Sequence, residues 1–79
     1  MKNKIKRMKK ILAKFGEDSR EISFIDGELT VIFASPSEWD GDIVVAHTWG
    51  WAIAPKDPAR WESWVKIMLE EEKLCFFPI

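Results

Sequence analysis

The residues best suited to chemistry in this sequence are its one histidine and its one cysteine, His47 and Cys75. A nucleophile and its base must lie within hydrogen-bonding reach of each other, and nothing in the spacing of these two residues indicates that they do. His47 lies among apolar residues, which favours a buried or half-buried imidazole bonded to the backbone. A structural zinc site needs four nitrogen or sulfur ligands. The pair therefore predicts neither a nucleophilic centre nor a zinc site.

Acidic side chains are the other groups whose chemistry could serve catalysis or metal binding. Asp40 with Asp42, or Asp57 with Glu62, lie near enough in sequence for acid–base catalysis or for binding a divalent ion. The chain has 13 acidic residues, so such proximities are expected by chance. The sequence has no glycine-rich phosphate-binding loop. We therefore predict that the protein is not an enzyme and holds no cofactor or metal ion.

Length and composition favour one small cytoplasmic domain, spanning residues 1–79. A chain of this size buries only about 60% of the surface that its unfolded form exposes, so each of its five Trp and five Phe residues matters to the core. A lone cysteine forms no internal disulfide and suits a reducing compartment. No apolar run approaches the roughly 20 residues of a membrane span, and we expect no secretion signal.

Charge is divided unequally along the chain. Residues 1–16 hold seven bases and no acids, whereas the rest holds five bases and all 13 acids, which gives it a net charge of −8. One interpretation is that a basic helix packs on an acidic body and partly neutralises it. The other is that the basic segment binds a polyanion.

Residues 3–15 have the apolar spacing of an amphipathic helix. Asn3 would cap its N-terminus, and Gly16 would end it in the left-handed conformation. Most of its lysines lie off the apolar stripe, so they are either solvated on a docked helix or bind nucleic acid or an anionic membrane. The stripe consists of Ile5, Met8, Ile11, Leu12 and Phe15.

Two strands, at about 20–25 and 28–34, are predicted to form a hairpin. Asp26-Gly27 between them is typical of a type I′ turn, because both central residues need a positive φ. A two-residue turn places Phe24 opposite Leu29 and Ile22 opposite Val31.

Residues 43–54 read as a central strand with a row of bulky residues at odd positions and a row of small residues at even positions. Gly50 could mark a bulge or a break in it. A two-residue turn at Asp40-Gly41 would put the bulky row outside, and an irregular loop over 35–42 would put it in the core. Pro36 has no N–H to donate to a neighbouring strand, and a small core needs the large side chains of the bulky row. We therefore predict that residues 35–42 form an irregular loop and that the bulky row is buried.

A second helix should follow, capped by Asp57 with Pro58 at its first position. Glu62 and Lys66 should form an ion pair on its outer face, and the acidic run 70–72 should be solvated. The apolar tail from residue 74 should pack on the core. Its buried stripe would consist of Trp61, Trp64, Val65, Met68 and Leu69.

The order of elements is therefore helix, β-hairpin, strand, helix and apolar C-terminal tail. This αβββα-like order predicts a small single domain of the α+β class, with both helices on one face of an antiparallel sheet.

Small size, excess tryptophan and an acidic body favour a protein-interaction module, an inhibitor or regulator that binds a larger protein. Compact domains of this kind are common among phage and mobile-element proteins, which is an analogy only. Self-association into a homo-oligomer is left open. The candidate protein-binding residues lie in the acidic loop, where Trp39 either anchors the loop to the core or contacts a partner; they are Glu38, Trp39, Asp40 and Asp42.

The alternative function is nucleic-acid binding by the basic first helix. We do not favour it, because the −8 body opposes a polyanion. Its candidate residues are Lys6, Arg7, Lys9 and Lys10.

Overall fold

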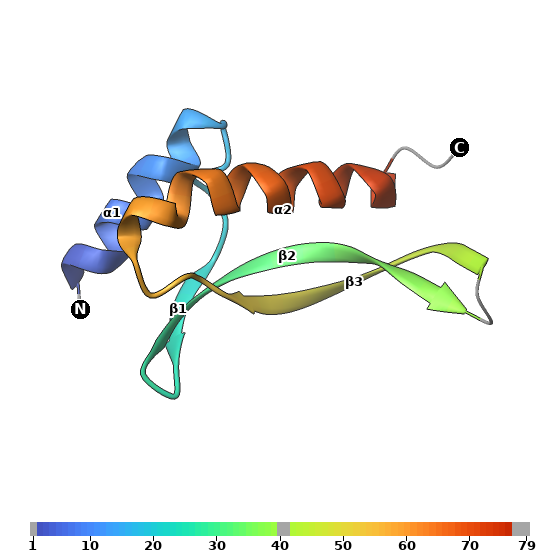
Figure 1. Ribbon diagram of the computed structural model, residues 1–79, viewed down its shortest axis with the longest axis horizontal. Helices are drawn as coiled ribbons and strands as arrows, with labels where there is room; N and C mark the ends of the chain where they lie inside the picture. Colours follow the sequence, from blue (N-terminus) through green and yellow to red (C-terminus); the bar gives the residue numbers. More distant parts are fainter. Residues whose placement is uncertain (1, 40–41, 77–79) are drawn as a thin grey trace.

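The computed structural model has two helices on one face of a three-stranded antiparallel sheet (Figure 1). The structure describes residues 2–39 and 42–76, and their side chains except at positions 2, 36–47, 74 and 76. The predicted α+β class and the shared helical face are confirmed. In chain order the elements are α1 (Lys2–Lys14), β1 (Ile22–Ile25), β2 (Glu28–Trp39), β3 (Asp42–Ile53), the short 3₁₀ helix η1 (Pro58–Arg60) and α2 (Trp61–Phe76).

Helix α1 spans Lys2–Lys14, one residue earlier at each end than predicted, and the predicted role of Gly16 is confirmed. Gly16 has a φ of +72°, and its N–H donates to the carbonyl of Ala13 while the N–H of Glu17 donates to that of Leu12. These two bonds form a Schellman motif, which satisfies the last carbonyls of the helix. Asn3 is not the N-cap, because the helix already includes Lys2.

The turn and the register of the β1–β2 hairpin are confirmed, although β1 begins later and β2 ends later than predicted. Asp26 and Gly27 have φ values of +52° and +78°, as a type I′ turn requires. Phe24 pairs with Leu29, and the register continues along both strands.

The predicted loop over 35–42 is wrong, because β2 and β3 run through it as a hairpin. Trp39 pairs with Asp42, and two residues separate them. Pro36 does not end β2, since the alternation of the ladder turns its missing N–H away from β3, toward the same edge as the N–H groups of Ile32 and Ala34. Gly50 neither bulges nor breaks β3, because the register shift lies between Pro36 and Ser37.

This register decides which row of β3 is inside. Phe33 pairs with Gly50 and Val31 pairs with Ala52, so the small row shares the helix-covered face with the core residues of β2. The prediction that the bulky row is buried is therefore wrong. The core is filled from the helices instead, and its buried members are Met8, Leu12, Leu29, Val31, Phe33, Ala54, Trp61 and Val65.

Helix α2 begins through η1, whose cap is the predicted one. The Asp57 carboxylate accepts a hydrogen bond from the N–H of Ala59 at 3.0 Å, with Pro58 at the first helical position. Trp61 is 2% exposed, and its Nε1 donates to the carbonyl of Pro55 at 2.7 Å. The ring of Trp64 meets that of Phe33 edge to face at 5.4 Å.

Two expectations about the charged and apolar parts of α2 are corrected. Glu62 pairs with Lys14 of α1 at 2.8 Å and not with Lys66. The Glu62–Lys14 ion pair joins the two helices at their exposed surface. The supposed tail begins inside the helix, with Cys75 buried in its last turn. Residues 77–79 lie outside the described part of the chain.

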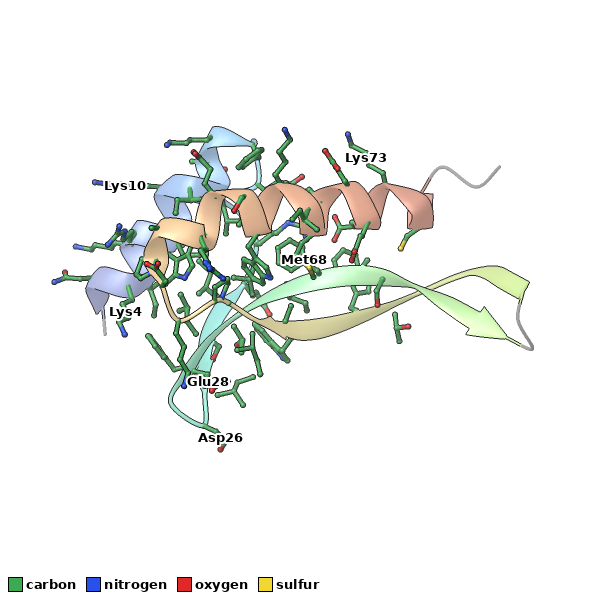
Figure 2. All side chains as sticks on the ribbon, in the orientation of Figure 1. Lys4, Lys10, Asp26, Glu28, Met68 and Lys73 are labelled. Carbon is green, nitrogen blue, oxygen red and sulfur yellow. The ribbon has the colours of Figure 1, made fainter. Side chains whose placement is uncertain are left out.

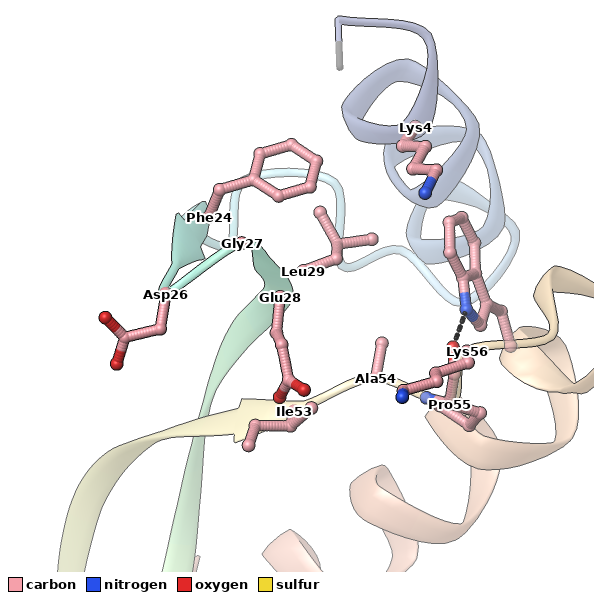
Figure 3. Close-up of a pocket in the computed structure, with 11 residues that line it drawn as sticks. Lys4, Phe24, Asp26, Gly27, Glu28, Leu29, Ile53, Ala54, Pro55 and Lys56 are labelled. Carbon is pink, nitrogen blue, oxygen red and sulfur yellow. Dashed lines mark hydrogen bonds between the residues drawn. The ribbon is translucent and has the colours of Figure 1, made fainter.

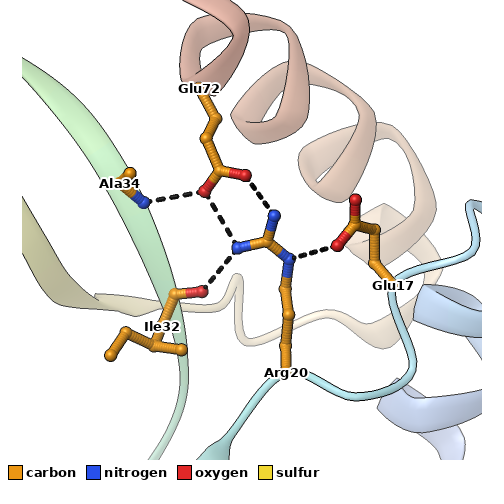
Figure 4. Close-up of polar contacts among 5 residues, drawn as sticks. All are labelled: Glu17, Arg20, Ile32, Ala34 and Glu72. Carbon is orange, nitrogen blue, oxygen red and sulfur yellow. Dashed lines mark hydrogen bonds and ion pairs between the residues drawn. The ribbon is translucent and has the colours of Figure 1, made fainter. Parts of the chain in front are cut away.

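A buried ion pair links α2 to the edge of β2 (Figure 4). The Arg20 guanidinium binds the Glu72 carboxylate through both terminal nitrogens and donates to the carbonyl of Ile32 at 3.0 Å. Glu72 also accepts the N–H of Ala34 at 2.7 Å, and Glu17 accepts from Arg20 Nε at 3.0 Å. The prediction of a solvated acidic run is wrong for Glu72, since this network buries it.

We predict that Glu72→Ala lowers the free energy of unfolding by about 3 kcal/mol, because it leaves the Arg20 charge and the Ala34 N–H unpaired in a buried place. Glu71 is exposed and serves as the matched control, so Glu71→Ala should change the free energy by no more than about 0.5 kcal/mol. Urea denaturation followed by circular dichroism measures both. Equal effects of the two substitutions would show that the network does not stabilise the fold.

Candidate functional site

The sheet face turned away from the helices, here called the outer face, exposes large apolar side chains. Side chains alternate along a strand, so the register that buries Val31 and Phe33 turns the other row outward. The exposed fractions are 40% for Ile25, 51% for Trp49, 42% for Trp51 and 60% for Ile53. Three of these four residues are consecutive members of one row of β3.

The polar group buried within the outer face has a partner inside the protein. Thr30 is 2% exposed, and its hydroxyl donates to the carbonyl of Ser23 across the ladder at 2.9 Å. This hydroxyl therefore needs no ligand. What the face offers to a partner is apolar area with the indole rings of Trp49 and Trp51.

The charged side chains on the outer face are acidic. Glu28 shares the face with Ile25, with which it pairs, and exposed Glu21 precedes β1 in the same alternation. Among the described sheet positions of this face there is no lysine or arginine. The apolar row is thus bordered by negative charge at the β1 side.

Three of the four candidate residues of the acidic loop lie on strands, and the structure does not describe their side chains. Glu38, Trp39 and Asp42 belong to the β2–β3 hairpin by their backbone, and their side chains lie outside the described part, as does all of Asp40. The side chain of His47 lies outside it too. The loop that should have presented these residues is a pair of strands.

The basic residues of α1 project from the helix, and Lys9 lines an open pocket together with Glu21 and Trp51 of the outer face. Lys6, Lys9 and Lys10 are exposed, and no described residue forms a hydrogen bond or ion pair with them. Figure 2 shows Lys10 projecting away from the rest of the molecule. Arg7 differs from them, because its guanidinium lies 5.9 Å from the centre of the Trp61 ring and so contributes to the fold.

An open pocket of about 470 Å³ lies where the β1–β2 turn meets α1 and the segment after β3 (Figure 3). Phe24, Leu29 and Trp61 contribute apolar surface to it. Its charged side chains are mixed in sign, with Lys4 and Lys56 against Asp26 and Glu28. The indole N–H of Trp61 is already bonded to Pro55. The pocket therefore favours no particular class of ligand.

No protein-family model, curated protein or solved structure matches this chain. Among the described residues, no group of three His, Cys, Asp or Glu side chains could hold a metal ion, and none of the described helices is long and apolar enough to cross a membrane. Burial and the nearby Glu72 carboxylate raise the pKa of the Cys75 thiol, which lowers its thiolate fraction.

Sequence reasoning identified the row of Trp49, Trp51 and Ile53 but assigned it to the core. The signal that would have placed it outside is the spacing of Asp40-Gly41, read as a two-residue turn. A turn of that length makes odd positions of β2 face even positions of β3. Pro36 favoured the irregular loop instead, but its missing N–H points away from β3 and does not disturb this register.

Proposed function

We propose that this protein is a small protein-interaction module, an inhibitor or regulator that binds a larger protein through its outer face. The observation that supports this is the exposure of three consecutive row members, Trp49, Trp51 and Ile53. A small domain gains stability by burying such residues, so their exposure calls for another use. Tryptophan is also the side chain most enriched among residues that dominate binding energy at interfaces.

The charges near the row indicate what kind of partner fits. Glu21 and Glu28 border the apolar surface, and an interface is favoured when opposite potentials meet. The partner should therefore present an apolar surface with lysine or arginine at its margin. Such a surface occurs in grooves that bind nucleic acid, and occupying such a groove would make this protein an inhibitor.

We predict that Ile53→Ser and Trp51→Ser abolish capture of the partner from the native cell, because each removes apolar contact area from the outer face. Ile67 is the matched control, being an isoleucine of α2 with 54% exposure against 60% for Ile53. The wild-type chain and Ile67→Ser should retain the same partner, identified by mass spectrometry after affinity capture with nuclease present.

Circular dichroism must show that the variants remain folded. The proposal fails if folded Ile53→Ser and Trp51→Ser variants recover the partner as well as the wild type does. It also fails if Ile67→Ser loses the partner to the same extent.

Nucleic-acid binding is a second candidate function, favoured by the free lysines of α1. A helix that binds phosphates must leave its basic face accessible, and Lys6, Lys9 and Lys10 are exposed without partners among the described residues. It ranks second because the chain outside residues 1–16 carries a charge of −8, which repels a polyanion.

We predict that the wild-type chain forms no tight complex with DNA or RNA at about 50 mM salt, since phosphate contacts must overcome this repulsion. Fluorescence anisotropy with labelled oligonucleotides measures it. A salt-sensitive complex that disappears in Lys6→Ala/Lys9→Ala/Lys10→Ala, and persists in Lys66→Ala/Lys73→Ala, would establish the second function instead. Arg7 is left in place because of its contact with Trp61.

A further inference from the structure

From Glu28 to Pro36, the edge of β2 that faces away from β3 has no outward N–H left for another strand. β1 pairs with its first residues. The N–H of Ile32 then donates to the carbonyl of Glu21 at 3.2 Å, the carbonyl of Ile32 accepts from Arg20, and the N–H of Ala34 donates to Glu72. Pro36, the next residue with this orientation, has no N–H. This edge offers little to another strand.

The edge of β3 is different, because β3 is the last strand of the sheet. Ile32 directs its backbone groups away from β3, so its pair with Trp51 is a non-hydrogen-bonded one, and the N–H and C=O of Trp51 point away from β2. The same alternation applies to Ile53, opposite Thr30. No backbone hydrogen bond joins Trp51 or Ile53 to another described segment outside the ladder, and no described helix lies alongside this edge (Figure 1).

The sequence of β3 also lacks the features that protect an edge. Natural edge strands are blunted by charged residues, by proline or by short length. From residue 43 to residue 53 the sequence is IVVAHTWGWAI, which contains no proline, lysine, arginine, aspartate or glutamate. Beyond β1, the protein uses the outward backbone groups of Ile32 and the N–H of Ala34 in internal hydrogen bonds. At the β3 edge, in contrast, the outward groups of Trp51 and Ile53 lie on an uncharged strand without a described partner.

We propose that the β3 edges of two copies of this chain pair antiparallel, forming a two-fold symmetric dimer with a continuous six-stranded sheet. An open edge is complemented by another strand, and β3 suits itself because it brings no like charges together. The residues whose backbone points outward are odd-numbered in both copies, so odd positions meet odd positions.

This pairing puts the two bulky rows on the same face as cross-strand neighbours. Aromatic pairs in that arrangement stabilise strand association. The dimer uses the backbone of the β3 edge, whereas the proposed partner protein contacts outer-face side chains, so the two inferences can fail separately. If both hold, the dimer presents two outer faces as one surface.

The test compares two substitutions at one position by sedimentation of the full chain over about a hundredfold range of concentration. Trp51→Pro removes an N–H that makes no hydrogen bond within the described part of the monomer, and should abolish the dimer. Trp51→Ala removes the same side chain but keeps that N–H, and should leave a dimer weakened by about tenfold or less. A wild-type chain that stays monomeric throughout, or a folded Trp51→Pro variant that dimerises like the wild type, would overturn the proposal.

Hydrogen exchange on the unmodified chain tests the proposal without relying on a variant that must fold. The amides of Trp51 and Ile53 should exchange rapidly in dilute solution and become protected as the concentration rises. The amides of Gly50 and Ala52, which face β2, should be protected at both concentrations. Exchange at Trp51 and Ile53 that does not depend on concentration would contradict the dimer.

Discussion

The rest of the structure depends on the parity of the register between β2 and β3. Successive side chains of a strand point to opposite faces, so a shift of one residue would exchange the buried and exposed rows of β3 completely. Two residues separate Trp39 from Asp42, which sets odd positions against even ones. The irregularity between Pro36 and Ser37 moves the register by two residues, which leaves this parity unchanged. The outer face is the direct result.

The core tolerates the loss of the bulky row because the helices supply its large side chains. Trp61 and Val65 of α2 and Met8 and Leu12 of α1 are all buried, and burial of each such side chain is worth about 1.5–3 kcal/mol. The small residues of β3 leave room on the inner face of the sheet.

Local chemistry predicted much of the fold, and interactions between distant segments explain the rest. Gly16, Asp26-Gly27 and Asp57-Pro58 act through bonds to near neighbours, so their roles were readable from sequence. Glu72 could not be assigned, because its partner Arg20 lies 52 residues away. The loop predicted from Pro36 was wrong for a similar reason, because the effect of a missing N–H depends on which edge of β2 faces β3. The sequence showed that the large residues of β3 alternate with small ones, but only the register with β2 determines which of the two sets faces the core.

The most direct test of this account compares single tryptophan substitutions by denaturant unfolding in dilute solution. Trp61→Ala should lower the free energy of unfolding by about 3–5 kcal/mol, as expected for a core residue. Trp49→Ala and Trp51→Ala should each lower it by about 1 kcal/mol or less, as expected for side chains that face solvent. If either of the latter two substitutions unfolds the protein as Trp61→Ala does, the bulky row is part of the core and the outer face does not exist as described.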